Sequence, residues 1–155
     1  MDIAEKNFKI EQFIKKTVED VCKELDAELV FITTNLNKLS DTDLMIVSLK
    51  LPTIIYNVYS QLEVIGGKAD TAKVVVEHKY NSKFVSIDSG TVDFKKAQAA
   101  MEVAESEIYV VGYQRAYKLI QGKVQAAYEL VNSAKKILSV REQERANITN
   151  SNLSN

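Results

Sequence analysis

The sequence predicts an all-α protein, a helical bundle or hairpin of about four helices that ends in one long C-terminal helix. Two observations support this prediction. The 155 residues include one proline and five glycines, fewer than the many tight turns of an all-β protein require. Apolar residues recur every three or four positions over most of the chain, which is the spacing of one helix face. With 46% hydrophobic and 26% charged residues, the chain has the composition of a protein that forms a core.

We expect a single helical domain over residues 1–146. Its first element is an acidic N-terminal helix within residues 1–35, because an apolar stripe runs through this segment with Lys and Glu between its members. The poor helix formers Thr33, Thr34 and Asn35 are expected to end this helix. The stripe consists of Phe8, Phe13 or Ile14, Val18, Val21, Leu25 and Leu29.

Central helices are expected within residues 40–90. A side-chain oxygen at Ser40 or Asp41 can cap the first free N–H groups. Pro52 removes a backbone donor and disfavours helix in the residue before it, which predicts a break or a kink there. Gly66-Gly67 is expected to end the next helix, because a glycine often follows the last helical residue. A third helix then runs to a turn at residues 88–91.

The long helix is expected over residues 92–145, which contain no proline and are weakened only by Gly112 and Gly122. A helix of about fifty residues would be about 75 Å long, more than the other helices of so small a chain are expected to cover. Either it bends at a glycine, or its stripe packs against other copies of the chain. The predicted oligomerisation stripe consists of Tyr113, Ala116, Ile120, Val124, Ala127, Val131, Ala134 and Leu138. Residues 147–155 are rich in Asn and Ser and are expected to be disordered.

Signatures of catalysis and of metal binding are missing from the sequence. The one cysteine, Cys22, and the one histidine, His78, lie in different segments, which argues against a Cys/His catalytic pair or zinc cluster. No phosphate-binding loop and no hydrolase motif occurs. We therefore expect no enzymatic activity, no cofactor and no metal; an enzyme would need an unseen cofactor or a site shared between chains.

The N-terminal twenty residues mix charged with apolar side chains and do not have the apolar segment of a secretory signal. No stretch approaches the ~18–20 apolar residues of a membrane-spanning helix. We expect a cytoplasmic protein, in the host cytoplasm if it is viral, that does not interact with membranes.

Charge is distributed unevenly along the chain although its net value is −1. Residues 1–67 hold 7 Lys/Arg and 11 Asp/Glu, whereas residues 68–141 hold 12 Lys/Arg and 8 Asp/Glu. Basic residues that cluster in one region are typical of nucleic-acid binding. The candidates in the central helices are Lys73, His78, Lys79 and Lys83, which would line a phosphate path together with Lys68. The alternative is an ordinary solvated face.

A second candidate lies in the long helix, where Tyr109, Tyr113 and Tyr117 are four residues apart and are therefore neighbours on a helix. With Arg115 and Lys118 beside them, their rings could bind single-stranded nucleic acid by stacking and charge. The alternative is a helix-packing seam with the hydroxyl groups at its edge.

The order of motifs over residues 55–141 resembles the UvsY-type recombination mediators of T-even-like phages. The motifs are Ile55-Tyr56-x-x-Tyr59-x-x-Leu62, Ala72-Lys73, His78-Lys79-Tyr80, Ser89-Gly90, Ala104-Glu105, Tyr117 and the run from Ala134 to Arg141. The resemblance implies a small helical protein that forms ring oligomers and binds single-stranded DNA through Lys73, His78, Lys79 and Lys83. Members of that family are more basic, and the acidic first helix is an addition to their pattern.

The resemblance and the basic and aromatic candidates lead to one hypothesis: a non-enzymatic, homo-oligomeric accessory protein that binds single-stranded DNA. Its partners would be a recombinase, which it loads, or a single-strand-binding protein. The other hypothesis is a structural, adaptor or virion-assembly protein that acts only through protein–protein contacts. It predicts self-association without affinity for nucleic acid.

Overall fold

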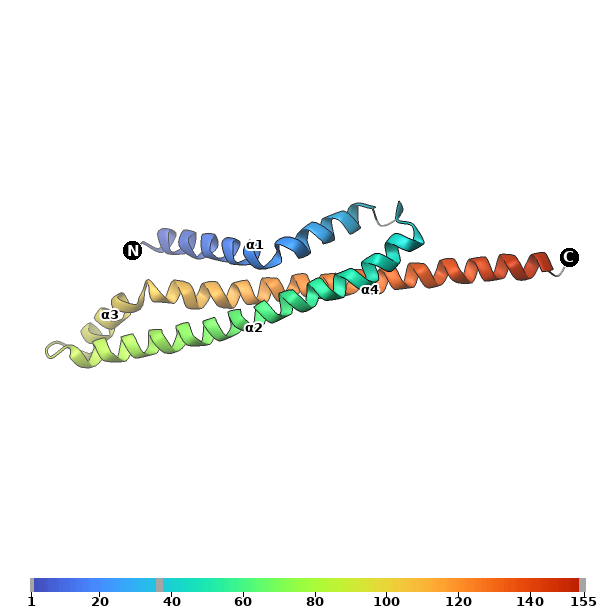
Figure 1. Cartoon of the computed structure of the whole chain (residues 1–155). Helices are drawn as coiled ribbons and strands as arrows, with labels where there is room; N and C mark the ends of the chain where they lie inside the picture. The colour runs from blue at the N-terminus through green and yellow to red at the C-terminus, as the bar shows by residue number, and fades with distance from the viewer. Residues whose placement is uncertain (1, 36–37, 154–155) are drawn as a thin grey trace. The chain divides into compact units, whose positions relative to one another are not determined.

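The computed structural model describes residues 2–35 and 38–153, with side chains described as far as Thr149. This part of the chain contains four helices and no strands, which confirms the predicted fold class. The helices are α1 (Ile3–Asn35), α2 (Asp41–Ser86), α3 (Val92–Val103) and α4 (Ser106–Leu153). Figure 1 shows α3 as a short helix in the return from α2 to α4. No helix in these residues is long and apolar enough to cross a membrane.

The contacts divide the chain into two compact units. Unit 1 contains residues 1–21 and 60–121, and unit 2 contains residues 22–59 and 122–155. Each unit therefore takes a part of α1, of α2 and of α4, and unit 1 also contains α3.

Unit 1 has a core to which all four helices contribute. Its buried side chains are Ile10 and Val18 of α1, Leu62, Ile65 and Ala69 of α2, Ala99 and Val103 of α3, and Ile108, Ala116 and Ile120 of α4. A half-buried ion pair joins α1 to α4, with Lys6 Nζ 2.6 Å from Glu107 Oε2. Hydrophobic burial therefore holds the unit together, and the ion pair fixes how α1 lies on α4.

Unit 2 has a core of three helices. Its buried side chains are Cys22, Leu25 and Ile32 of α1, Leu44, Val47, Leu51, Ile54, Ile55 and Val58 of α2, and Val124, Ala127, Val131 and Ala134 of α4, together with Leu39 before α2. Arg141 Nη1 donates to the Leu39 carbonyl and to Asp41 Oδ1, both at 2.9 Å. Arg145 also pairs with Asp41, so two arginines of α4 hold the start of α2.

The start of α2 is capped as the sequence predicts. The Asp43 amide donates to Ser40 Oγ at 3.2 Å, and the Ser40 amide donates to Asp43 Oδ2 at 3.0 Å. This reciprocal pair is a capping box with an aspartate as its acidic member. The predicted turn before α3 is also present: Gly90 has a φ of +110°, and Thr91 caps α3 by accepting from the Phe94 amide.

The helix has no break at Pro52, the first of the two predicted alternatives there, and the predicted helix end at Gly66-Gly67 is wrong. Both sites lie inside α2, which runs unbroken from Asp41 to Ser86. Pro52 lies beside Leu51 and two residues before Ile54, which are at most 4% exposed, so burial of the helix outweighs the lost hydrogen bond. Gly66 contacts a ring of α4: a methyl group there would lie 3.4 Å from Tyr117 Cε2. This glycine provides room for a close helix contact.

The long helix also differs from its prediction. A turn at residues 104–105 separates α3 from α4, where the sequence predicts one helix over residues 92–145. Val103 and Ile108 are both buried. In one unbroken α-helix these two residues, five positions apart, would point about 140° away from each other. The turn allows both side chains to enter the core. At the other end, α4 continues to Leu153, although residues 147–155 were expected to be disordered; residues 154 and 155 lie outside the described part.

Candidate nucleic-acid interface

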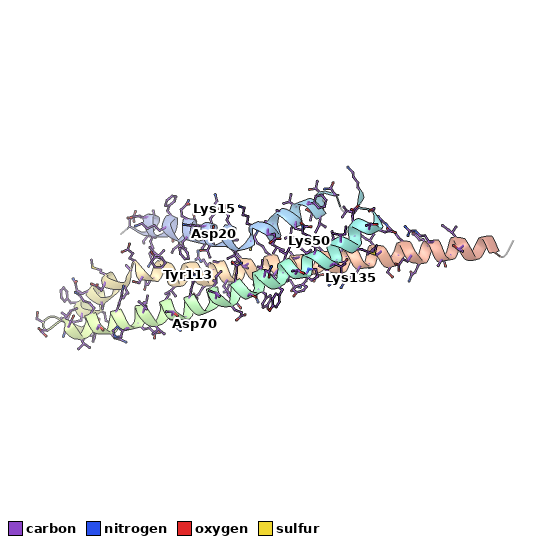
Figure 2. The ribbon with its side chains drawn as sticks, in the orientation of Figure 1. Lys15, Asp20, Lys50, Asp70, Tyr113 and Lys135 are labelled. Atoms are coloured by element: carbon purple, nitrogen blue, oxygen red, sulfur yellow. The ribbon has the colours of Figure 1, made fainter. Side chains whose placement is uncertain are left out.

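A groove runs over unit 1 between α1, α2 and α4. It consists of two adjoining hollows of about 670 Å³ and about 370 Å³. Both are lined by Val64 and Lys68 of α2 and by Tyr113 of α4, which is labelled in Figure 2. We call the two hollows together the unit 1 groove. The larger hollow extends past Lys79 and Ser106, and the smaller one reaches Phe13, Lys16 and Asp20 of α1.

One face of α2 lines the groove over its whole length. Its lining residues Val64, Lys68, Thr71, Val75 and Lys79 are three or four positions apart, so they lie above one another on the helix. Lys68 and Lys79 are therefore separated by about 16 Å along the helix axis, because each residue of a helix rises about 1.5 Å. This separation is long enough for the two lysines to contact different phosphates of an extended strand.

The groove has an aromatic wall. The Phe13 ring packs edge-on against two rings of α4, with centroids 5.5 Å from that of Tyr109 and 4.8 Å from that of Tyr113. These contacts, at angles of 89° and 90°, have the edge-to-face geometry that aromatic rings prefer. Tyr109 remains 48% exposed. A fixed, half-exposed ring is what a base needs for stacking.

Three lysines and one aspartate, Asp20, provide the charges of the groove. Lys16 and Lys68 are exposed and form no ion pair or hydrogen bond in the described part of the chain. Lys79 donates a hydrogen bond to Ser106 Oγ at 3.1 Å, which holds its ammonium group at the end of the groove near α4. The groove therefore carries an excess of positive charge that the protein itself leaves largely unneutralised.

The six cations predicted from the sequence do not form one patch. His78, Lys79 and Lys83 line a separate shallow hollow of about 410 Å³ together with Glu102 of α3. The Lys83 ammonium lies 3.8 Å from the Glu102 carboxylate, so its charge is partly neutralised within the protein. Of these three residues, Lys79 also borders the unit 1 groove.

Lys73, Arg115 and Lys118 lie elsewhere. Lys73 lies six residues before Lys79 and therefore about 120° around α2 from it, on a different face of the helix. Lys118 lines a third hollow that also contains the carboxylates of Glu63 and Asp70. Arg115 is exposed and lies two residues from Tyr113, nearly on the opposite side of α4.

The three tyrosines predicted to lie together are divided between two sides of α4. Tyr109 and Tyr113 line the unit 1 groove, whereas Tyr117 lines the third hollow and packs over Gly66. Sequence analysis missed Phe13 and Lys16 as members of the groove. Spacing within one helix cannot indicate which residues of another helix will lie beside it, so the sequence held no signal for them.

The uneven charge along the chain disappears in the folded protein. Unit 1 joins the acidic residues 1–21 to residues 60–121 and holds 12 Lys/Arg and 13 Asp/Glu, while unit 2 holds 8 of each. Any attraction for nucleic acid must therefore be local, because neither unit is basic as a whole.

Most residues of the predicted oligomerisation stripe are buried within their own units, so a second copy is not needed to cover them. Ala116 and Ile120 belong to the core of unit 1, and Val124, Ala127, Val131 and Ala134 to that of unit 2, each at most 4% exposed. Tyr113 and Leu138 are half-buried. The physical reason is that within each unit a part of α2 and a part of α1 pack against the part of α4 that the unit contains.

Cys22 is fully buried in unit 2. Burial raises the pKa of its thiol to about 11, the Asp26 carboxylate adds to this rise, and Lys123 opposes it. Such a thiol is protonated at neutral pH and is a poor nucleophile. Across residues 2–35 and 38–153, no group of three His, Cys, Asp or Glu side chains is placed to hold a metal ion.

Comparison of the chain with protein-family models, with curated proteins and with solved structures finds no match in any of the three.

Proposed function

We propose that this protein is a non-enzymatic accessory protein that binds single-stranded DNA along the unit 1 groove. The observation that supports this most directly is the combination of Lys16, Lys68 and Lys79 with the half-exposed ring of Tyr109 along two adjoining hollows of unit 1. Lysines that follow a strand backbone and a ring that stacks on a base are the two components of sequence-independent single-strand binding.

Binding through this groove is weak and strongly dependent on salt. Three neutralised phosphates give a slope of about −2 in a plot of log affinity against log salt concentration for a single strand. Raising the salt from 50 to 200 mM then lowers the affinity about fifteenfold. The uncharged polar side chains that line the groove are Thr17, Gln61, Thr71, Ser106, Tyr109 and Tyr113. Because stacking and phosphate contacts carry the binding, we expect little sequence preference.

The resemblance over residues 55–141 gives the proposal its biological setting. A small homo-oligomeric helical protein of the cytoplasm, or of the host cytoplasm if viral, would hold a single strand. It would help to load a recombinase onto DNA covered by single-strand-binding protein. Loading a recombinase is a different activity from binding the strand, so it is tested in a separate experiment.

A second candidate is an adaptor or virion-assembly protein that acts through protein–protein contacts alone. The exposed apolar side chains of unit 2 favour it, because Leu49 and Tyr56 of α2 are 77% and 72% exposed. Single exposed apolar residues are ordinary, but a continuous patch of them marks an interaction surface. This candidate predicts self-association without affinity for DNA.

Fluorescence anisotropy with a labelled 30-base oligonucleotide tests the proposal. We expect binding at 50 mM salt that the triple variant Lys16→Ala/Lys68→Ala/Lys79→Ala reduces at least tenfold. The matched control is Lys73→Ala/Arg115→Ala/Lys118→Ala, which removes the same charge from outside the groove and should retain most of the affinity. Absence of binding by the wild type, or equal losses in the two triple variants, contradicts the groove.

A test of the ring uses Tyr109 alone. Tyr109→Ala removes the stacking surface and should weaken binding about five- to tenfold or more, since base–aromatic stacking contributes about 1–3 kcal/mol. Tyr109→Phe retains the ring and should bind like the wild type. If Tyr109→Ala binds as well as Tyr109→Phe, the ring does not stack on a base.

A further inference from the structure

The part of α2 in unit 2 has a second apolar face whose side chains are between 43% and 77% exposed. Met45, Leu49, Tyr56 and Tyr59 are 50%, 77%, 72% and 43% exposed. With the half-buried Pro52 between them, their positions advance in steps of 4, 3, 4 and 3, the spacing of a coiled-coil seam. We call these five residues the α2 stripe.

The α2 stripe is distinct from the face of α2 that forms the core of unit 2. The core face contains Leu44, Leu51 and Val58, each at most 3% exposed. The middle of the stripe lies about 120° around the helix from that face. A surface helix normally places charged residues at such positions, so an apolar stripe there requires an explanation other than the core of the unit.

Charge is nearly absent around the stripe. Between Asp43 and Glu63 the one charged residue of the sequence is Lys50. Its ammonium group lies 2.7 Å from the Glu28 carboxylate of α1, and Figure 2 labels Lys50 on this part of α2. The surface therefore offers almost nothing that would attract a charged partner.

We propose that the α2 stripe packs against the same stripe of a second copy of this chain. The spacing supports a helix as the occupant, because steps of 3 and 4 follow one face of a partner helix. The spacing is also nearly symmetrical about Pro52, since the other members lie 7 and 3 residues before it and 4 and 7 residues after it. In an antiparallel pair, Met45 faces Tyr59 of the second copy, Leu49 lies within one residue of the level of Tyr56, and the two Pro52 rings lie close to the two-fold axis. Such an isologous contact requires only one surface.

The area is at the lower limit for a specific dimer. With about 200 Å² for each fully exposed large side chain, the exposed parts of the stripe amount to about 480 Å² per copy. Complete burial of both stripes removes about 960 Å² in total, slightly below the ~1,000 Å² of the smallest stable interfaces, so the dimer is a weak one. We expect association in the micromolar range. This inference does not rest on the unit 1 groove, because the stripe and the groove belong to different units.

Sedimentation equilibrium from 5 to 100 µM measures the association. The wild type should approach twice the chain mass of 17.4 kDa, and Met45→Lys/Leu49→Lys should remain at the mass of one chain. The matched control is Leu119→Lys, which replaces a 53% exposed leucine of α4 outside the stripe and should leave the dimer intact. Helicity measured by circular dichroism verifies that each variant is folded.

A cross-link tests the two-fold packing. Under mild oxidation Pro52→Cys should form a disulfide-linked dimer, whereas Asn57→Cys, which is exposed on another face of α2, should not. The buried Cys22 serves as an internal negative control. A wild type that stays at one chain mass at 100 µM overturns the proposal. So does a folded Met45→Lys/Leu49→Lys variant that still dimerises, or cross-linking that is equal at positions 52 and 57.

Discussion

Two glycines of α4 permit a matched test of the packing in unit 1. A methyl group built at Gly112 overlaps Phe13 Cδ1 and lies 3.0 Å from Phe13 Cε1, whereas one built at Gly122 meets nothing within 4 Å. Both positions lie in the interior of the same helix. Gly112→Ala and Gly122→Ala therefore gain the same helix propensity and differ only in what the new methyl group meets.

The structure determines the sign of each effect. Replacing glycine by alanine in a helix interior stabilises by about 1 kcal/mol, and this is the whole effect expected at Gly122. At Gly112 the methyl group must displace the Phe13 ring, which is held by its edge-on contacts with Tyr109 and Tyr113. Overpacking of this kind costs about 1–3 kcal/mol. We therefore expect Gly112→Ala to be about 2 kcal/mol less stable than Gly122→Ala.

Urea denaturation followed by circular dichroism at 222 nm measures both free energies of unfolding. A double-mutant cycle then isolates the steric contribution. In a Phe13→Ala background the obstacle is gone, so Gly112→Ala should stabilise as Gly122→Ala does. If Gly112→Ala stabilises the wild-type chain as much as Gly122→Ala does, the close approach of α1 to α4 at Gly112 is refuted.

Three further predictions follow from unit 2. Pro52→Ala restores a helix hydrogen-bond donor and should raise the free energy of unfolding by about 1–3 kcal/mol in urea titrations; an unchanged midpoint would contradict this. At pH 8 Cys22 should react with a thiol reagent at least about a hundredfold more slowly in the native chain than in urea, because its pKa is about 11 instead of 9.0; equal rates would show that it is exposed. Hydrogen bonds from Arg141 and then Arg145 lower the pKa of Asp41 below its ordinary 3.8, so the stabilisation is present at neutral pH and is lost as the pH falls through the lowered pKa. Thermal melts should show Asp41→Asn to be less stable than wild type at pH 7 and equal to it well below pH 3.8; a difference that persists there would exclude the arginine pair as its cause.

The sequence predicted the features that depend on a few neighbouring residues. A side chain close to the helix start caps α2 at Ser40, and in the predicted turn at residues 88–91 Gly90 adopts a positive φ. These are local interactions between residues at most three positions apart, so the type and order of the residues are enough to indicate them.

The features that the sequence missed depend on tertiary contacts. Pro52 and Gly66-Gly67 are local signals for helix ends, yet α2 continues through them because side chains beside them, such as Leu51 and Ile65, are buried in the cores of their units. The groove was missed for a similar reason. Its lysines come from two helices that are distant in the sequence, and Lys16 lies in a segment whose overall charge is acidic.

The α2 stripe and the stripe of α4 show what apolar periodicity alone leaves open. Both have helical spacing, and the longer stripe of α4 was the natural candidate for contacts between copies. Its neighbours are charged or polar and exposed, such as Lys118, Gln125 and Glu129, so α4 has one apolar face, and its own chain covers that face. The segment of α2 between Asp43 and Glu63 has one charged residue and two apolar faces, and α1 and α4 of unit 2 bury only one of them. The absence of charge beside a stripe, rather than the length of the stripe, therefore distinguishes a face that needs a second chain from one that the first chain already covers.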